Sequence, residues 1–303
     1  MVDSRRIGKA VFWNALDLLT RSGLKLVVLV VLARWLRPAD FGLFAMLAIF
    51  VAIAQLLIES GFSQALIQRQ DSTHADESSI FFFNLMMGAV VAVLLCLASP
   101  GVAAFYAQPL LEPMTCWMAL NLFINTFGGI HTALLQKELD FETLTKVGFF
   151  ATLVSSGVAL GMAASGWGVW SLVGQVLANT IVSVILLWLL HAWRPTWMFS
   201  FATLRSYFRF GGWLLWTSLL YVIYTNLYAM MIGKLHAVQD VGYYTQARRL
   251  QQIPINIVTS MAGRVSFPVY ASVAADKQKL ARGLSKATRA VVFVTLPLML
   301  AIM

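Results

Sequence analysis

Charged side chains are scarce in this chain of 303 residues. Asp, Glu, Lys and Arg make up 12% of it, whereas hydrophobic residues make up 59%. Soluble domains carry about 25% charged residues, so the composition excludes an ordinary soluble protein. The mean hydropathy of +0.77 and the twenty Phe and ten Trp are typical of a bilayer protein with aromatic residues near both interfaces.

Several patterns that carry chemistry are also missing. The two cysteines, Cys96 and Cys116, lie in or beside apolar segments without CxxC or metal-ligand spacing, which predicts inert thiols and no metal site. No nucleophile stands at a recognisable spacing from a base, and there is no Gly-rich phosphate loop. We therefore expect neither an enzyme nor an ATP-driven pump, and no cofactor.

The net charge of +9 would suggest nucleic acid in a soluble protein. Here the basic residues form no continuous patch, so we expect no nucleic-acid partner. The basic segment 1–9 is not followed by a short apolar core with a small-residue cleavage site, so we expect no cleavable signal.

Apolar segments recur along the whole chain with polar breaks between them. A membrane-spanning helix needs about 20 apolar residues, and the pattern predicts an all-α polytopic protein. The predicted spans are 12–34, 42–64, 79–99, 114–135, 146–165, 168–190, 207–232, 250–274 and 287–303. The longest outer loop is expected at 99–113. The sequence stops inside the ninth span, so we expect a longer protein.

The Lys and Arg residues set the expected orientation. With the N-terminus inside, inner segments hold fourteen of the 22 basic residues, outer segments hold five, and the rest lie within spans. Cytoplasmic loops carry such an excess. We therefore expect a multi-pass protein of the bacterial inner membrane with a cytoplasmic N-terminus.

Two loop sequences repeat at an offset of 200 residues. The paired residues are Arg34 and Lys234, Asp40 and Asp240, Gly42 and Gly242, and Phe44 and Tyr244. Six predicted spans separate the copies, so both face the same side, as in parallel repeats of transporters. This predicts a cytoplasmic segment 1–11, a first six-helix lobe 12–190, a cytoplasmic linker 191–206 and a partial second lobe 207–303.

Polar residues form a stripe along the first predicted span. Asn14, Asp17, Arg21 and Lys25 are spaced three, four and four residues apart, which places them on one helical face. Charges within a span are tolerated mainly against a bundle interior or an aqueous cavity. The stripe therefore predicts a cationic cavity, although an interfacial helix with snorkelling side chains would give the same pattern.

Further candidate cavity residues lie in three other spans. In the eighth span they have i+4 spacing, and in the seventh they are mostly tyrosines that would suit sugar stacking or simple packing. The candidates are Asn256, Ser260, Arg264, Tyr221, Tyr224 and Tyr228. Glu59, near the inner end of the second span, is a candidate with Asp17 for ion coupling, or is merely interfacial.

Three segments carry a family resemblance: 34–45, which begins Arg-Trp-Leu-Arg-Pro-Ala-Asp-Phe-Gly; 59–69, Glu-Ser-Gly-Phe-Ser-Gln-Ala-Leu-Ile-Gln-Arg; and 241–250, Val-Gly-Tyr-Tyr-Thr-Gln-Ala-Arg-Arg-Leu. In this order they resemble the polysaccharide flippases of the MOP superfamily, particularly the colanic-acid type of Wzx translocase. The resemblance covers the whole chain.

The resemblance implies a MATE-like bundle of two six-helix lobes, here truncated. It implies transport of undecaprenyl-diphosphate-linked oligosaccharides to the periplasmic leaflet for exopolysaccharide, lipopolysaccharide or O-antigen assembly. It also implies the lipid bilayer and this glycan as partners, with a polymerase or another assembly protein as a further candidate. By analogy with lipid II flippases, Arg21 and Arg264 would line the cavity, and Lys25 is a looser match.

Other functions are left open by the sequence. A cation-coupled multidrug exporter of the same superfamily is disfavoured, because three intramembrane cations would repel a cationic cargo. A glycosyltransferase would need larger outer loops with paired catalytic residues. A non-transporting component of polysaccharide assembly is separated from a flippase only by a transport assay.

Overall fold

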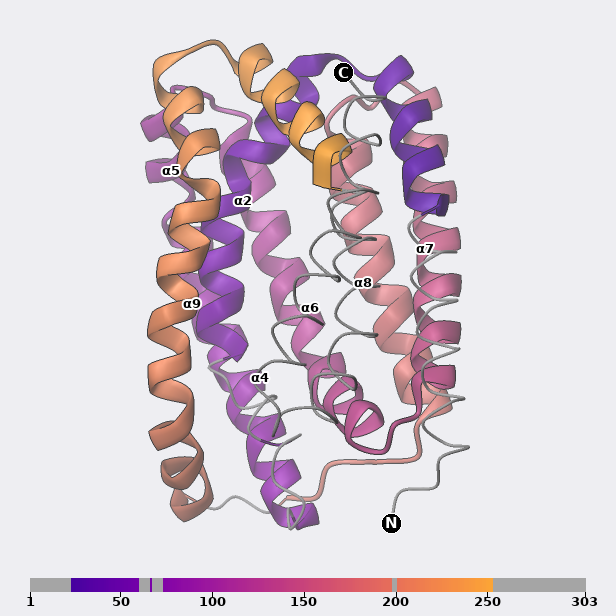
Figure 1. The fold of residues 1–303 in the computed structure, drawn as a ribbon, viewed down its shortest axis with the longest axis vertical. Helices are drawn as coiled ribbons and strands as arrows, with labels where there is room; N and C mark the ends of the chain where they lie inside the picture. The colour runs from indigo at the N-terminus through magenta and orange to yellow at the C-terminus, as the bar shows by residue number, and fades with distance from the viewer. Residues whose placement is uncertain (1–22, 60–65, 67–72, 198–200, 253–303) are drawn as a thin grey trace, which may run out of the picture. The chain divides into compact units, whose positions relative to one another are not determined.

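The described residues of the computed structural model are almost entirely helical. They comprise 23–59, 66, 73–197 and 201–252, of which 201–214 are described by backbone alone. The helices are α2 (Pro38–Glu59), α4 (His74–Leu97), α5 (Ser99–Tyr106), α6 (Leu111–Lys137), α7 (Phe141–Ala164), α8 (Trp170–Leu190) and α9 (Phe201–Leu235) (Figure 1). Residues 23–35 and 238–252 are also helical.

Six described helices are long and apolar enough to cross a membrane. They are α2, α4, α6, α7, α8 and the part Leu215–Leu235 of α9. These helices correspond to the second through seventh predicted spans, so the all-α polytopic prediction is confirmed. Most of the eighth span, all of the ninth and the first half of the first lie outside the described residues. Segment 99–113, predicted as a loop, instead contains the short helix α5.

Local side-chain chemistry explains several helix boundaries. Thr73 caps α4 in a reciprocal capping box, in which its hydroxyl accepts from the Asp76 amide and Asp76 accepts from the Thr73 amide at 3.0 Å. Asp140 caps α7 by accepting from the amide of Thr143 at 3.1 Å. The turn into α8 passes through Gly166, whose φ of 79° suits a residue without a Cβ.

The chain divides into two compact units, 1–242 and 243–303, and the helices α2 to α9 belong to the first. Within it, α7 packs on α8, α4 on α6, and α2 on α9 (Figure 1). Small and hydroxylated residues on α7 are buried, and Asn179 of α8 donates to Ser155 at 3.3 Å. Small residues let membrane helices approach closely, and such amides bond across the interface.

The two copies of the repeated loop have the same local structure. The amide of Arg37 donates to the Asp40 carboxylate at 2.9 Å, and the amide of Ala237 donates to the Asp240 carboxylate at 3.2 Å. In both copies a helix ends, two residues follow, and a new helix begins. The carboxylate therefore performs the same capping task at both positions.

The repeated glycines cross each other reciprocally. A Cβ atom on Gly42 would overlap the carbonyl oxygen of Val238, and a Cβ atom on Gly242 would overlap the carbonyl oxygen of Pro38. Val238 is the counterpart of Pro38 at the 200-residue offset. Each copy thus contacts its partner as its partner contacts it, which is the signature of a two-fold relation.

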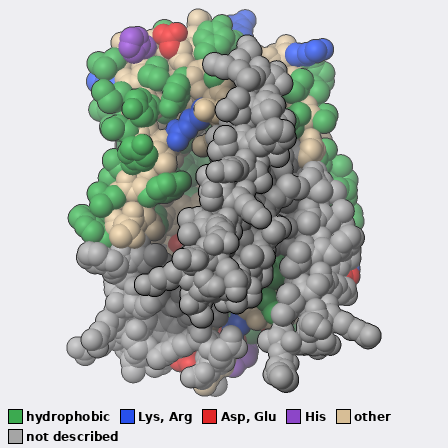
Figure 2. Space-filling view, viewed as in Figure 1, with side chains coloured by type: hydrophobic (Ala, Val, Ile, Leu, Met, Phe, Trp, Pro, Cys, Tyr) green, Lys and Arg blue, Asp and Glu red, His purple; other side chains and the backbone are tan. Residues whose placement is uncertain are grey.

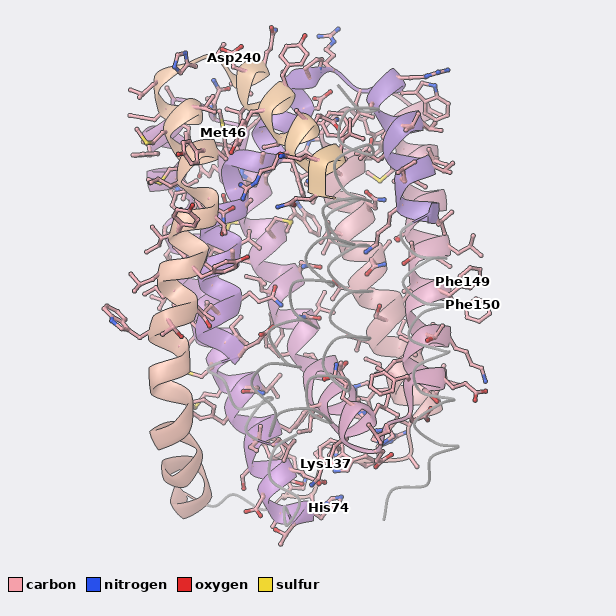
Figure 3. All side chains as sticks on the ribbon, in the orientation of Figure 1. Met46, His74, Lys137, Phe149, Phe150 and Asp240 are labelled. Atoms are coloured by element: carbon pink, nitrogen blue, oxygen red, sulfur yellow. A yellow bond between two sulfur atoms is a disulfide. The ribbon has the colours of Figure 1, made fainter. Side chains whose placement is uncertain are left out.

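The two ends of the helices carry different residues. His74 and Lys137 lie at one end and Asp240 lies at the other (Figure 3). Phe149 and Phe150 project away from α7 (Figure 3), and 51% of Phe150 is exposed. Hydrophobic side chains also cover much of the coloured surface in Figure 2. An apolar exterior is what a lipid-facing bundle requires.

Candidate functional site

A cavity of about 600 Å³ lies among five helices of the first unit. Its lining comes from the last turns of α2, the middle of α4, the second half of α6, the first turns of α7 and part of α8. Because α6 ends and α7 begins at the end where Lys137 lies (Figure 3), the cavity extends from the predicted cytoplasmic side toward the middle of the bundle. Its volume is within the usual range for small-ligand sites.

The described lining mixes polar and apolar side chains and carries a single charge. Its amides and hydroxyls come from Gln55, Asn84, Asn125, Thr126, Thr132, Gln136, Thr145 and Ser183. Glu59 is the single charged residue among the described lining residues, and it accepts a hydrogen bond of 2.8 Å from Gln55. Apolar side chains such as Phe141 and Leu144 complete the wall. Such a surface can both donate and accept hydrogen bonds without favouring an anion.

Asn84 provides an unused acceptor at the cavity. It is 6% exposed, and its Oδ1 has no hydrogen-bond partner among the described residues. An unsatisfied buried polar atom costs about 1–3 kcal/mol. A ligand hydroxyl placed at this oxygen would remove that cost.

Adjacent glycines on α6 have different surroundings. A Cβ on Gly128 would lie 3.1 Å from Leu187 and 3.3 Å from Val184, so this glycine allows α8 to approach closely. A Cβ on Gly129 would meet nothing within 4 Å, although Gly129 also lines the cavity. Gly129 therefore leaves open space at the cavity wall.

The structure tests few of the site residues predicted from the sequence. Six of them lie outside the described residues: Asn14, Asp17, Arg21, Asn256, Ser260 and Arg264. Lys25 is exposed on the helix 23–35 and is not among the described lining residues, whereas Glu59 is. Tyr221, Tyr224 and Tyr228 share one exposed face of α9 and also lie outside the described lining. Their roles stay predictions.

The sequence interpretation of the cysteines as inert did not predict that they pair. Cys96 near the end of α4 and Cys116 in α6 form a disulfide. They lie at the predicted periplasmic ends of these helices, and the periplasm is an oxidising compartment. Twenty residues separate them, so only the antiparallel packing of α4 on α6 brings them together.

Two histidines lie in contact across helices. His131 of α6 is fully buried, and its Nδ1 lies 3.0 Å from Nδ1 of His191 at the end of α8. Trp193 contacts the His131 ring edge-on at 5.4 Å and donates to Glu77 of α4 at 2.9 Å. The predicted linker between lobes is thus packed against α4 and α6. The available signal in the sequence was the pair of tryptophans, Trp193 and Trp197, that follow His191.

The arrangement of these helices indicates the fold class. It is similar to that of a solved structure, a multidrug resistance transporter of the MATE family of the MOP superfamily in an inward-facing conformation. The match covers 95% of this chain and 68% of that structure, with a TM-score of 0.64 and 16% identity. The chain is therefore a multi-pass α-helical protein with a MATE-like fold, located in the bacterial inner membrane.

The family follows from residues 31–303, which match the profile of the polysaccharide biosynthesis protein family. The chain belongs to that family, which confirms the resemblance to polysaccharide flippases of the MOP superfamily. It is 28% identical to the teichuronic acid biosynthesis protein TuaB of Bacillus subtilis over 82% of this chain and 52% of the relative.

Two further relatives carry related names. The lipopolysaccharide biosynthesis protein WzxC of Escherichia coli is 27% identical, over 96% of this chain and 60% of the relative. The succinoglycan biosynthesis transport protein ExoT of Rhizobium meliloti is 23% identical, over 98% of this chain and 60% of the relative. The chain thus spans between half and two thirds of the length of these relatives.

Proposed function

We propose that the protein containing this chain moves undecaprenyl-diphosphate-linked oligosaccharides from the cytoplasmic to the periplasmic leaflet. The observation that carries the proposal is the cavity whose described lining holds eight amide and hydroxyl side chains and no Lys or Arg, and which reaches from the predicted cytoplasmic end into the bundle. Amides and hydroxyls suit the many hydroxyls of a glycan. The protein acts as a transporter and makes or breaks no covalent bond in the glycan.

The proposed mechanism is alternating access between two lobes that rock about a central site. Arg21, Lys25 and Arg264 attract the pyrophosphate through charge-assisted hydrogen bonds. The polyprenyl tail stays in lipid while the sugars occupy polar space. Asp17 moderates the attraction, and Asp17 and Glu59 couple transport to an ion gradient. The intramembrane position of these ionisable residues in the sequence supports such roles, because charges are rarely kept in spans without function.

Deletion of the gene tests the proposal in cells. We expect lipid-linked oligosaccharide to accumulate in the cytoplasmic leaflet and the surface polysaccharide to disappear, with both restored by the full-length gene. Normal export by the deletion strain would refute the function, provided that no second flippase gene is present. In the complemented strain, Arg21→Ala or Arg264→Ala should reduce export at normal protein level. Undiminished export by these variants would refute the role of the arginines in binding the pyrophosphate and leave the flippase function standing.

One observation favours a second candidate, a cation-coupled multidrug exporter. The fold match is to a multidrug transporter, and Glu59 is the one charged residue in the described lining. A carboxylate in a polar cavity suits a cationic drug. Increased sensitivity of the deletion strain to cationic dyes, with normal surface polysaccharide, would support this candidate over the flippase.

A further inference from the structure

We infer that the cavity of the first unit is the subsite for uncharged sugar residues of the cargo and does not hold its pyrophosphate. The inference rests on the proposed function and deepens it by dividing the cargo between two places. The sugars bind between α2, α4, α6, α7 and α8, and the anionic group binds elsewhere.

The charge of the wall is the first argument. The described lining contains no Lys or Arg, and its one charged side chain is the carboxylate of Glu59. An anion in this low-dielectric space would be repelled by Glu59 and would find no charge-assisted donor among the described lining residues to offset its desolvation. A pyrophosphate or a uronic acid is therefore a poor occupant, whereas a neutral hexose or N-acetylhexosamine carries no such penalty.

The hydrogen-bonding capacity of the wall is the second argument. Sugar hydroxyls donate and accept, as amides and hydroxyls do. Asn84 lines the cavity, and its Oδ1 is buried without a partner among the described residues, so a turn of this side chain toward a sugar hydroxyl would give the oxygen a donor. The hydrogen-bonded pair of Gln55 and Glu59 adds acceptor oxygens on α2. A neutral donor-rich ligand satisfies these groups, and an acceptor-only anion does not.

The space at Gly129 is the third argument. A side chain built there would extend into the cavity without striking its neighbours, because nothing lies within 4 Å of its Cβ position. The apolar faces of sugar rings can pack on Phe141 and Leu144, which line the cavity nearby. The cavity thus offers both polar and apolar contacts, as sites for small ligands do.

Gly129 allows a steric test with a matched control. Gly129→Leu in the full-length protein should fill the cavity and reduce export at least about tenfold. Gly157→Leu is the control, because Gly157 lies in the interior of α7, also has nothing within 4 Å of its Cβ position, and is not among the described lining residues. Both variants should reach the membrane at normal level, and the control should export normally. Equal export by both variants would overturn the inference.

A protection experiment separates sugar from pyrophosphate. Thr132→Cys places a thiol on the cavity wall, while Cys96 and Cys116 are held in their disulfide; other cysteines of the full-length protein are replaced by serine. In inside-out vesicles, a membrane-impermeant maleimide should label Thr132→Cys. Lipid-linked oligosaccharide with neutral sugars, extracted from the producing strain, should slow this labelling. Undecaprenyl diphosphate without sugars should not.

The control thiol for this experiment is Lys146→Cys. Lys146 is exposed near the start of α7 and is not among the described lining residues, so its labelling should not change with either lipid. Equal protection of Thr132→Cys by the sugar-free lipid would place the pyrophosphate in the cavity and overturn the inference. Normal export without protection by either lipid would refute the subsite and leave the proposed function standing. Loss of the function itself is measured independently in the deletion strain.

Discussion

Replacement of Gly42 by alanine is the sharpest perturbation of the crossing between the two copies of the repeat. The added Cβ would overlap the carbonyl oxygen of Val238. The carbonyl carbon and Cγ1 of Val238 would lie 2.9 and 3.0 Å from this Cβ. A backbone carbonyl cannot rotate aside as a flexible side chain can, so the two helices must separate. Overpacking of this kind costs about 1–3 kcal/mol.

The expected change in melting temperature follows from this energy. For proteins of 150–250 residues 1 kcal/mol corresponds to roughly 2–4 °C, and a larger protein shifts less, so Gly42→Ala should lower the melting temperature by a few degrees and by less than about 12 °C. The assay is fluorescence-detected size-exclusion chromatography of the full-length protein in detergent after heating. Gly242→Ala should lower the free energy of unfolding by a similar amount, because its added Cβ would overlap the carbonyl oxygen of Pro38. The double variant should cost less than the sum, since one separation of the helices accommodates both methyl groups.

Gly157→Ala is the control for this series. It also adds a methyl group to a helix interior, yet nothing lies within 4 Å of its Cβ position. Because Ala has the higher helix propensity, this variant should melt at the same temperature or slightly higher. A Gly42→Ala variant as stable as this control would refute the close crossing and with it the reciprocal contact of the repeat.

Three further predictions concern the ends of the bundle. Reduction of the Cys96–Cys116 disulfide, or Cys96→Ser, should cost about 3 kcal/mol by freeing the connecting loop; an unchanged melting temperature in dithiothreitol would contradict this. Trp193→Ala removes the hydrogen bond to Glu77 and should cost roughly 3 kcal/mol, with faster hydrogen exchange confined to residues 191–197; exchange as slow as in the parent protein would refute the packed linker. Burial raises the pKa of Tyr106 to about 12, so the folded state keeps this proton while the unfolded state ionises near pH 10. Stability should therefore fall as the pH rises from about 10 to 12, and Tyr106→Phe should flatten that fall; an identical pH profile for both proteins would contradict it.

The sequence predicted the spans well because each consists of one long apolar run. The described helices α2 to α9 overlap the second through seventh predicted spans, apart from α5. That helix was missed because Ser99–Tyr106 is too short to span a bilayer, although Pro100 in its first turn is a helix-start signal. The repeat was recognisable because its glycines and capping carboxylates serve local geometry that few other residues can provide.

The candidate site could not be predicted in the same way. Its lining comes from five helices, and residues such as Asn84 and Gln136 are single polar positions in otherwise apolar runs. These residues form a site only because the five helices bring them to one cavity. That arrangement depends on how the helices pack. The Cys96–Cys116 disulfide was missed for the same reason. The charged stripe at Asn14–Lys25 was predicted from spacing alone, since i+3 and i+4 positions share a helical face, and it stays a prediction because Asn14, Asp17 and Arg21 lie outside the described residues.

Transport by the purified full-length protein in proteoliposomes tests the central claim most directly. The lumenal leaflet is loaded with lipid-linked oligosaccharide carrying neutral sugars, and a lectin added outside reports the fraction that becomes accessible. The account predicts rapid exposure with the parent protein and with Gly157→Leu, and slow exposure with Gly129→Leu and with protein-free vesicles. Exposure no faster with the parent protein than without protein would contradict it.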